Sequence, residues 1–227
     1  MRVISVNVGL PRQVEDDGDL VATAIYKQPV ATRVAVRRLN LDGDQQADLT
    51  VHGGPDKAVY LYSVEHYPEW QREFPNLTFD YGQFGENLTV QGLREHEVFI
   101  GDRYRMGSAI LQVTQPRAPC FKLGIRFGRP RMVKQFLQSG KTGFYCAVLE
   151  EGDVGHGDDI ALIERFFGSL SIATLVELYR CRHTDPDVLK RAVDLPHLAE
   201  PWRAHLAHKL TRVSTSPGKE RREPDTQ

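Results

Sequence analysis

The chain has 227 residues, 41% of them hydrophobic and 26% charged, and its formal net charge is −1 at pH 7. These values are typical of a globular protein with a real core, and they argue against a nucleic-acid partner because no overall field attracts phosphates. No apolar run reaches the length of a membrane span, and the N-terminal sequence MRVISVNVGLPRQ lacks a signal-peptide pattern. We therefore expect a cytoplasmic protein with no membrane partner, whose three widely spaced cysteines stay reduced.

The first part of the chain predicts short strands. Arg2–Val8 carries Val3, Ile4, Val6 and Val8 at strand-like spacing. Thr23–Lys27 and Val34–Leu41 predict two further strands, whereas the polar segment Pro11–Asp19 predicts an irregular loop. Short strands punctuated by Gly, Asp and Pro favour an all-β sandwich or barrel over βαβ units.

The next segment, QADLTVHGGPDKAVYLYSVEHYPEW, concentrates polar residues around a glycine pair. Adjacent glycines allow the backbone to approach a ligand closely or to adopt positive φ. Taken alone, the segment is better explained as a tight turn with a solvated Asp56–Lys57 pair. As part of a site, its candidate residues are His52, Gly53, Gly54, Asp56 and Lys57.

A second polar cluster, GQFGENLTVQGL, places Gly85, Glu86 and Asn87 before the strand-like run Leu88–Val90. The simpler interpretation is a hairpin loop whose asparagine makes a local backbone hydrogen bond. Polar, glycine-containing loops on a strand-rich framework nevertheless predict that these loops converge at one rim.

The third cluster lies in LQVTQPRAPCFKLGIRF, residues 111–127. Pro116 and Pro119 fix φ and bias the residues before them toward extended geometry, so the backbone that carries Arg117 and Cys120 should be stiff. A thiol held beside a guanidinium is a candidate for chemistry. The alternative is that Cys120 is a small buried apolar residue, as most free cysteines are.

Helical and strand patterns alternate in the following residues. Met132–Leu137 has helical spacing, and Gly140 is a helix-ending signal. Thr142–Glu150 and Asp159–Glu164 predict strands, and Cys146 lies inside an apolar run that assigns it to the core.

The C-terminal part predicts three short helices, Ser171–Arg180, Asp185–Val193 and Glu200–Leu210, with Ser171 and Asp185 as N-caps. A unit of about forty residues needs a larger body to pack against. We thus expect a β-barrel domain over residues 1–168, a three-helix domain over 169–212 and a disordered tail over 213–227. The histidines of this part do not form a metal-ligand pattern.

Together these passages resemble the MOSC family, named for the C-terminal domain of molybdenum cofactor sulfurase, and in particular its bacterial YiiM-like branch. The resemblance rests on QADLTVHGGPDKAVYLYSVEHY, on GQFGENLTVQGL with EVFIGD behind it, and on QPRAPCFKL. It covers residues 1–165, and the three later helices look like the small α-helical domain of that branch.

The resemblance implies a mainly β fold, a MOSC-type barrel with a few peripheral helices, that binds molybdenum cofactor (molybdopterin). It implies reduction of N-hydroxylated compounds such as 6-hydroxylaminopurine, and Cys120 as the catalytic thiol and molybdenum ligand. A thiolate suits such a metal as a soft ligand, and Arg117 can hold the cofactor phosphate in a bidentate manner. The cofactor-binding candidates are Arg117, His52, Gly53, Gly54, Asp56, Lys57, Gly85, Glu86 and Asn87.

The implied reaction removes the hydroxyl oxygen of an N–OH substrate, and its electrons come from a separate flavin or iron–sulfur reductase. The chain itself has no cysteine cluster for an iron–sulfur centre and no GxGxxG for a dinucleotide. A homodimer is expected only from the general frequency of dimers.

Three other functions remain open. In the first, the protein binds the cofactor or carries sulfur as a Cys120 persulfide. In the second, it is an interaction protein that docks through its helices. The third, a zinc hydrolase using His52 and Cys120, lacks a third ligand at suitable spacing.

Overall fold

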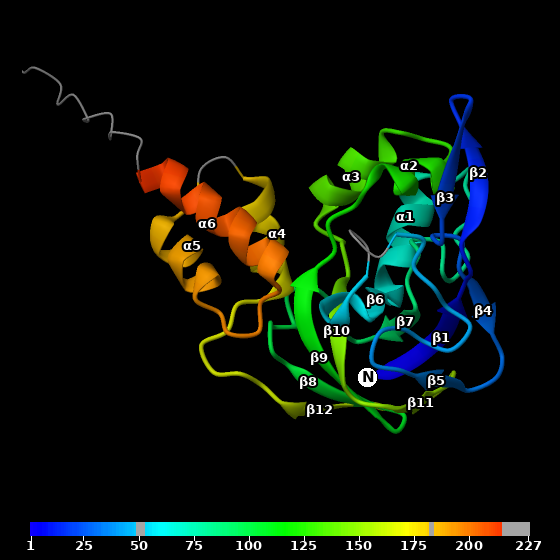
Figure 1. Cartoon of the computed structure of the whole chain (residues 1–227), viewed down its shortest axis with the longest axis horizontal. Coiled ribbons are helices and arrows are strands. Elements are labelled where there is room, and N and C mark those ends of the chain that lie inside the picture. The colour runs from blue at the N-terminus through cyan, green and yellow to red at the C-terminus, as the bar shows by residue number, and fades with distance from the viewer. Residues whose placement is uncertain (49–52, 182–183, 215–227) are drawn as a thin grey trace, which may run out of the picture.

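A computed structural model describes residues 1–48, 53–181 and 184–214 (Figure 1). Within these residues, eight strands pair into one sheet in the order β12-β8-β9-β10-β6-β7-β1-β4. All neighbours are antiparallel except β6 and β7. The strands are β1 Arg2–Val8, β4 Gln28–Val30, β6 Val59–Ser63, β7 Leu88–Gln91, β8 Arg103–Met106, β9 Ala109–Pro116, β10 Phe144–Glu150 and β12 Ile160–Glu164.

Two shorter pairs of strands accompany this sheet in the described residues: β2 (Arg12–Asp16) with β3 (Asp19–Thr23), and β5 (Val34–Val36) with β11 (Gly152–Val154). The first pair corrects the irregular loop predicted for residues 11–19. Asp17 and Gly18 both have positive φ, at 50° and 88°, and Asp-Gly is a strong two-residue hairpin signal. The strand predicted for residues 23–27 was also wrong, because β3 already ends at Thr23.

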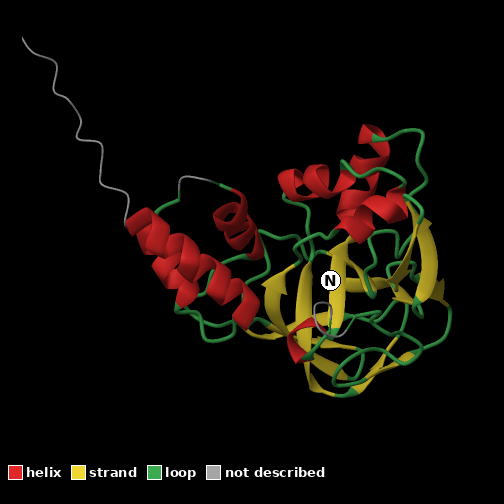
Figure 2. Ribbon diagram, turned by 45° about the horizontal axis from the view of Figure 1, so that its top comes forward, coloured by secondary structure: helices red, strands yellow, loops and turns green. Residues whose placement is uncertain are grey.

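The helices form two groups, one beyond the ends of the strands and one beside them (Figure 2). The first group contains α1 Tyr67–Glu73, α2 Phe121–Phe127 and α3 Met132–Ser139, with the 3₁₀ turns η1 Pro55–Lys57 and η2 Val64–His66 earlier in the chain. The second contains α4 Ile172–Arg180, α5 Pro186–Val193 and α6 Glu200–Ser214.

The helix ends predicted at Gly140, Ser171 and Asp185 are confirmed. Gly140 follows α3 in the left-handed conformation, with φ 73°. The Ser171 hydroxyl accepts a hydrogen bond from Thr174 N at the start of α4, and Asp185 accepts from Asp187 N at the start of α5. Each cap satisfies a backbone donor that has no partner inside the helix.

Apolar side chains of the described residues form two buried clusters. The larger one runs from the sheet into the C-terminal helices and includes Val113, Leu175 and Leu206. The smaller one is mainly aromatic and packs Trp70 and Phe84 among α1, α2 and α3. Since the larger cluster continues past residue 168, the C-terminal helices obtain their packing from the sheet, as a unit of that size requires. The domain boundaries remain a prediction.

The architecture is sheet-dominated with several helices, which confirms the coarse fold class. The ladder has β12 at one edge and β4 at the other, and an isolated bridge between Arg2 and Asp159 brings the start of β1 beside β12. One isolated bridge is not a strand pair, so closure of the sheet into a barrel remains a prediction. In the described part of the chain, no helix combines the length and hydrophobicity needed to cross a bilayer.

Gly143, just before β10, supports a testable prediction because its φ is +63° and a Cβ there would lie 2.3 Å from the Leu61 carbonyl oxygen. Gly128 has nearly the same φ, +60°, but nothing within 4 Å of a Cβ. We expect Gly128→Ala to lower the free energy of unfolding by about 1 kcal/mol through backbone strain. Gly143→Ala should cost roughly 2 kcal/mol more through overpacking. Urea unfolding measures both, and equal losses would contradict the predicted clash.

Candidate functional site

A cavity of about 600 Å³, its open mouth included, lies where β6, β10, η1 and the start of α2 meet. Its wall combines residues from all three polar clusters of the sequence, namely Lys57, Gly85, Asn87, Arg117 and Cys120. The three polar clusters therefore meet at one cavity, as the sequence predicted.

Cys120 is the N-cap residue of α2, with φ −110° and ψ 172°. This extended conformation is typical of an N-cap residue, and the Cys120 carbonyl accepts the Leu123 N–H at 3.0 Å. The residue is partly exposed, and its thiol interacts electrostatically with the Arg117 guanidinium. Cys120 is therefore not a core cysteine. Cys146 is one, because it is fully buried on β10.

Arg117 is a buried cation whose guanidinium is fixed by several contacts. It is 6% exposed, and its Nη1 donates to Tyr60 Oη at 3.2 Å and to the Phe84 carbonyl. Its guanidinium carbon lies 4.7 Å from the centroid of the Tyr60 ring, in cation–π geometry. Burial raises the pKa of Tyr60, so this phenol stays protonated at neutral pH. These two hydrogen bonds of the Arg117 side chain go to a phenol and a carbonyl group, and neither goes to a carboxylate.

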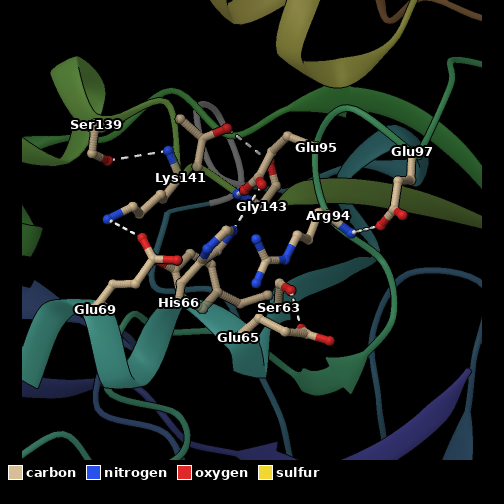
Figure 3. Close-up of polar contacts among 12 residues, drawn as sticks. Ser63, Glu65, His66, Glu69, Arg94, Glu95, Glu97, Ser139, Lys141 and Gly143 are labelled. Atoms are coloured by element: carbon tan, nitrogen blue, oxygen red, sulfur yellow. Dashed lines mark hydrogen bonds and ion pairs between the residues drawn. The ribbon is translucent and has the colours of Figure 1, made fainter.

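A polar cluster around Glu95 joins η2, α1 and the segment just before β10 (Figure 3). Glu95 Oε1 accepts the Gly143 N–H at 2.8 Å, and Glu95 Oε2 lies 2.7 Å from His66 Nε2. The Gly143 carbonyl in turn accepts the Arg117 backbone N–H at 3.3 Å. Lys141 makes an ion pair with Glu69 at 2.6 Å on the outer side of the cluster. These contacts fix the backbone from which Arg117 projects.

Three further lining residues, Lys27, Asp44 and Asn87, form a second hydrogen-bonded group. Lys27 is buried and makes an ion pair with Asp44, and burial lowers the pKa of Lys27 although Asp44 opposes this. Asp44 also accepts the Asn87 Nδ2–H at 2.9 Å, and Asn87 Oδ1 accepts the Tyr60 N–H at 3.0 Å. Asn87 therefore connects the carboxylate to the strand that carries Tyr60.

The described lining of the cavity has more positive than negative charge. Lys27, Lys57, Arg117 and Lys122 face a single carboxylate, that of Asp44. In a partly enclosed site such an excess attracts anionic ligands, and arginine is suited to bidentate contact with a phosphate. Because no three His, Cys, Asp or Glu side chains cluster as ligands in residues 1–48, 53–181 and 184–214, these residues hold no ligand set for a closed metal site.

The remaining predicted site residues that the structure describes do not line this cavity. Glu86 is fully buried and is not among the described lining residues; it accepts hydrogen bonds from Gly82 N at 2.8 Å and Phe84 N at 3.1 Å. Gly53, Gly54 and Asp56 are not among the described lining residues; the Asp56 carbonyl accepts the Thr114 hydroxyl at 2.6 Å. His52 lies outside the described residues.

Several lining residues were missed by the sequence analysis, chiefly Lys27, Asp44, Tyr60 and Tyr145. Lys27 entered the sequence analysis only as the last residue of a predicted strand, and the other three did not enter it as site residues. Tyr60 and Tyr145 are paired across β6 and β10, with ring centroids 5.1 Å apart. That pairing joins residues 85 positions apart, so no local sequence pattern predicts it.

Comparisons with known proteins show what this chain is similar to. Residues 48–161 match the family model described as MOSC domain. A Bacillus subtilis (strain 168) protein named uncharacterized protein YflK is 43% identical over 93% of this chain and 95% of its own length. The crystal structure of YiiM from Geobacillus stearothermophilus has a TM-score of 0.77 and 36% identity, over 92% of this chain and 98% of that one. A Gibberella moniliformis protein named reductase is 36% identical over 79% of this chain, which spans only 32% of that protein.

Proposed function

We infer that this chain, which belongs to the MOSC domain family, is a molybdenum-cofactor-dependent reductase of N-hydroxylated compounds. The observation that carries the proposal is the cavity itself, in which the partly exposed thiol of Cys120 lies beside the buried cation of Arg117. A relative is named reductase, which is compatible with an enzymatic role.

The lining residues suit the cofactor. A bound molybdopterin would supply a redox-active metal together with a phosphate, and the chain would supply a soft thiolate ligand, Cys120. Arg117 and Lys57 would receive the phosphate, because both are cationic and line the same wall. Gly85 and Asn87 would present backbone and amide groups to the pterin. The barrel expected of this family would keep these loops at one rim.

The proposed reaction consumes two electrons and two protons and converts R–NHOH to R–NH₂ and water. The N–O bond breaks, and the nitrogen is reduced. The electrons come from a separate flavin or iron–sulfur reductase, which is the partner that this proposal requires. The chain's own residues bind and orient the substrate, and they exclude bulk water from the site.

The test is the composition of the protein purified from a host that builds the cofactor. We expect one molybdenum per chain by elemental analysis, a stoichiometric pterin by fluorescence after oxidation, and reduction of an N-hydroxylated purine with a chemical electron donor. Cyanide-releasable sulfur in the absence of molybdenum would instead indicate the sulfur-carrier alternative and would reject the reductase.

Arg117→Lys should weaken cofactor retention while keeping the positive charge. Lysine has no planar fork, so it cannot bind a phosphate in a bidentate manner while also donating to Tyr60 Oη and the Phe84 carbonyl as Arg117 Nη1 does. We expect roughly a tenfold to hundredfold lower cofactor affinity, measured as pterin retained after dialysis. Arg126→Lys, in the helix that follows Cys120, serves as the control because Arg126 is not among the described lining residues. Equal retention by both variants would contradict the role of Arg117.

A further inference from the structure

Two consecutive carbonyl groups hold Arg117 at both of its ends. The Gly143 carbonyl accepts the Arg117 backbone N–H at 3.3 Å, and the Thr142 carbonyl accepts the Tyr60 hydroxyl at 2.8 Å. The Tyr60 oxygen in turn accepts a hydrogen bond from Arg117 Nη1 at 3.2 Å. The segment of Thr142 and Gly143 therefore contacts the backbone of Arg117 directly and its guanidinium through Tyr60. A shift of this segment would move the cation that lines the Cys120 cavity.

This segment is itself held by one buried carboxylate, that of Glu95 (Figure 3). Glu95 is 6% exposed, and its Oε1 accepts the Gly143 N–H at 2.8 Å. The Glu95 backbone carbonyl accepts the Ala173 N–H at 2.9 Å, which is one of the first N–H groups of α4 and has no acceptor inside that helix. Glu95 is thus fixed between α4 and the segment that contacts Arg117.

The second oxygen of the Glu95 carboxylate is fixed by His66. His66 Nε2 lies 2.7 Å from Glu95 Oε2, and the imidazole is buried with its edge against the Tyr62 ring, at a centroid distance of 5.4 Å. His66 Nδ1 is a buried atom without a hydrogen-bond partner in the described part of the chain. An unpaired buried polar atom lowers stability and calls for an explanation. The hydrogen bonds that hold the Arg117 cation supply one.

We propose that Glu95 and His66 are positioning residues that set the affinity of the Cys120 cavity for an anion, because they hold the segment 142–143 and through it Arg117. Neither residue is among the described lining of the cavity, so both act through the guanidinium. Hydrogen bonds weaken steeply when donor and acceptor are misaligned, and a donor fixed in advance loses less freedom on binding. The inference rests on the proposed function only for the identity of the anion, the cofactor phosphate.

The experiment titrates the full chain, purified without cofactor, with inorganic phosphate and follows binding by ³¹P NMR. Glu95→Leu removes the acceptor of the Gly143 N–H and should weaken phosphate binding about threefold to tenfold, the effect of one hydrogen bond. Glu95→Gln keeps an oxygen for that N–H and gains an amide N–H that His66 Nε2 can accept. Phosphate binding by Glu95→Gln should lie within about twofold of the wild type.

A double-mutant cycle with Arg117→Met separates positioning from a general structural role. In the Arg117→Met background no guanidinium is left to position, so adding Glu95→Leu should change phosphate binding by less than about twofold. His66→Leu leaves Glu95 in place and should weaken binding about twofold to threefold, again only when Arg117 is present. This variant keeps the test decisive if Glu95→Leu does not fold.

Asp102 offers a matched control because it is a fully buried carboxylate that is not among the described lining residues of the cavity. It accepts the Phe99 N–H at 3.0 Å and makes an ion pair with Arg165 at 2.8 Å. Asp102→Leu should lower the urea midpoint of unfolding, as Glu95→Leu does, but should bind phosphate as the wild type does. Equal weakening of phosphate binding by Asp102→Leu and Glu95→Leu would overturn the inference.

The inference is also overturned if the wild type binds no phosphate, or if Glu95→Leu weakens binding by the same factor with and without the Arg117 side chain. Failure of the proposed function has a different result. Phosphate would then bind and respond to the variants as described, but the protein purified from a host that builds the cofactor would contain neither molybdenum nor pterin.

Discussion

Cys120→Ser is expected to abolish reduction of N-hydroxylated compounds, with kcat/KM lowered by at least about 1,000-fold, equivalent to roughly 4 kcal/mol of transition-state stabilisation. A serine hydroxyl stays protonated at neutral pH and is a hard ligand, so it cannot replace a soft thiolate. Because Cys120 is partly exposed, the substitution removes no core packing. The free energy of unfolding should change by less than about 0.5 kcal/mol.

Cys181→Ser is the control for this variant. Cys181 is another free, partly exposed thiol, but it follows α4 and bonds to Glu177, and it is not among the described lining residues of the Cys120 cavity. The Cys181→Ser variant should retain full activity and its full content of molybdenum. Full activity with bound cofactor in Cys120→Ser would reject the assignment of the thiol as ligand.

Glu86→Ala should cause the largest loss of stability, about 4 kcal/mol. The Glu86 carboxylate is fully buried and accepts hydrogen bonds from four donors, which are Tyr67 Oη, Gly82 N, Phe84 N and Thr89 Oγ1. A buried donor left without a partner costs about 1–3 kcal/mol, and alanine leaves all four. Since the Phe84 carbonyl holds Arg117, cofactor retention should fall as well.

The measurement is urea unfolding of the purified variant beside Glu73→Ala. Glu73 is an exposed glutamate at the end of α1, where substitution should change the free energy of unfolding by less than about 0.5 kcal/mol. If Glu86→Ala lowers the free energy of unfolding as little as Glu73→Ala does, the Glu86 carboxylate does not stabilise the loop that contains Gly82 and Phe84.

The same residue gives the protein a pH dependence of defined sign. Burial raises the pKa of Glu86 above the ordinary value of 4.5, although its hydrogen bonds oppose this. The folded chain therefore holds a proton in a pH range where the unfolded chain has released it. The stabilisation is fully present below pH 4.5 and is lost as the pH rises through the raised pKa. Relative to Glu86→Gln, which does not titrate here, the wild type should become less stable as the pH rises from 4.5; a constant difference would contradict the shift.

Local patterns in the sequence were sufficient for many elements. The β1 strand follows from the spacing of its valines, and Gly140, Ser171 and Asp185 mark helix ends as expected. Such signals depend on backbone conformation and on hydrogen bonds within a few residues. The Asp17–Gly18 hairpin carried a signal of the same kind, and the error there was one of interpretation.

The candidate site was predictable only in part. Arg117 and Cys120 were found because two prolines and a resemblance to known motifs marked them. Gly53, Gly54 and Asp56 came from the same reasoning, but they are not among the described residues of the cavity. A polar glycine turn predicts where the backbone can bend, and it does not predict which side chains then face the ligand.

The sequence alone determined that the chain is a strand-rich protein with a helical C-terminal part and a thiol beside a guanidinium. Only the tertiary structure decided that Lys27, Tyr60 and Tyr145 line the same cavity as that thiol, and that α6 contributes to an adjoining cavity. The reason is that strand order and register are set by burial and pairing between distant segments, such as Tyr60 with Tyr145. Those interactions depend on the whole packed sheet, and no short stretch of sequence contains them.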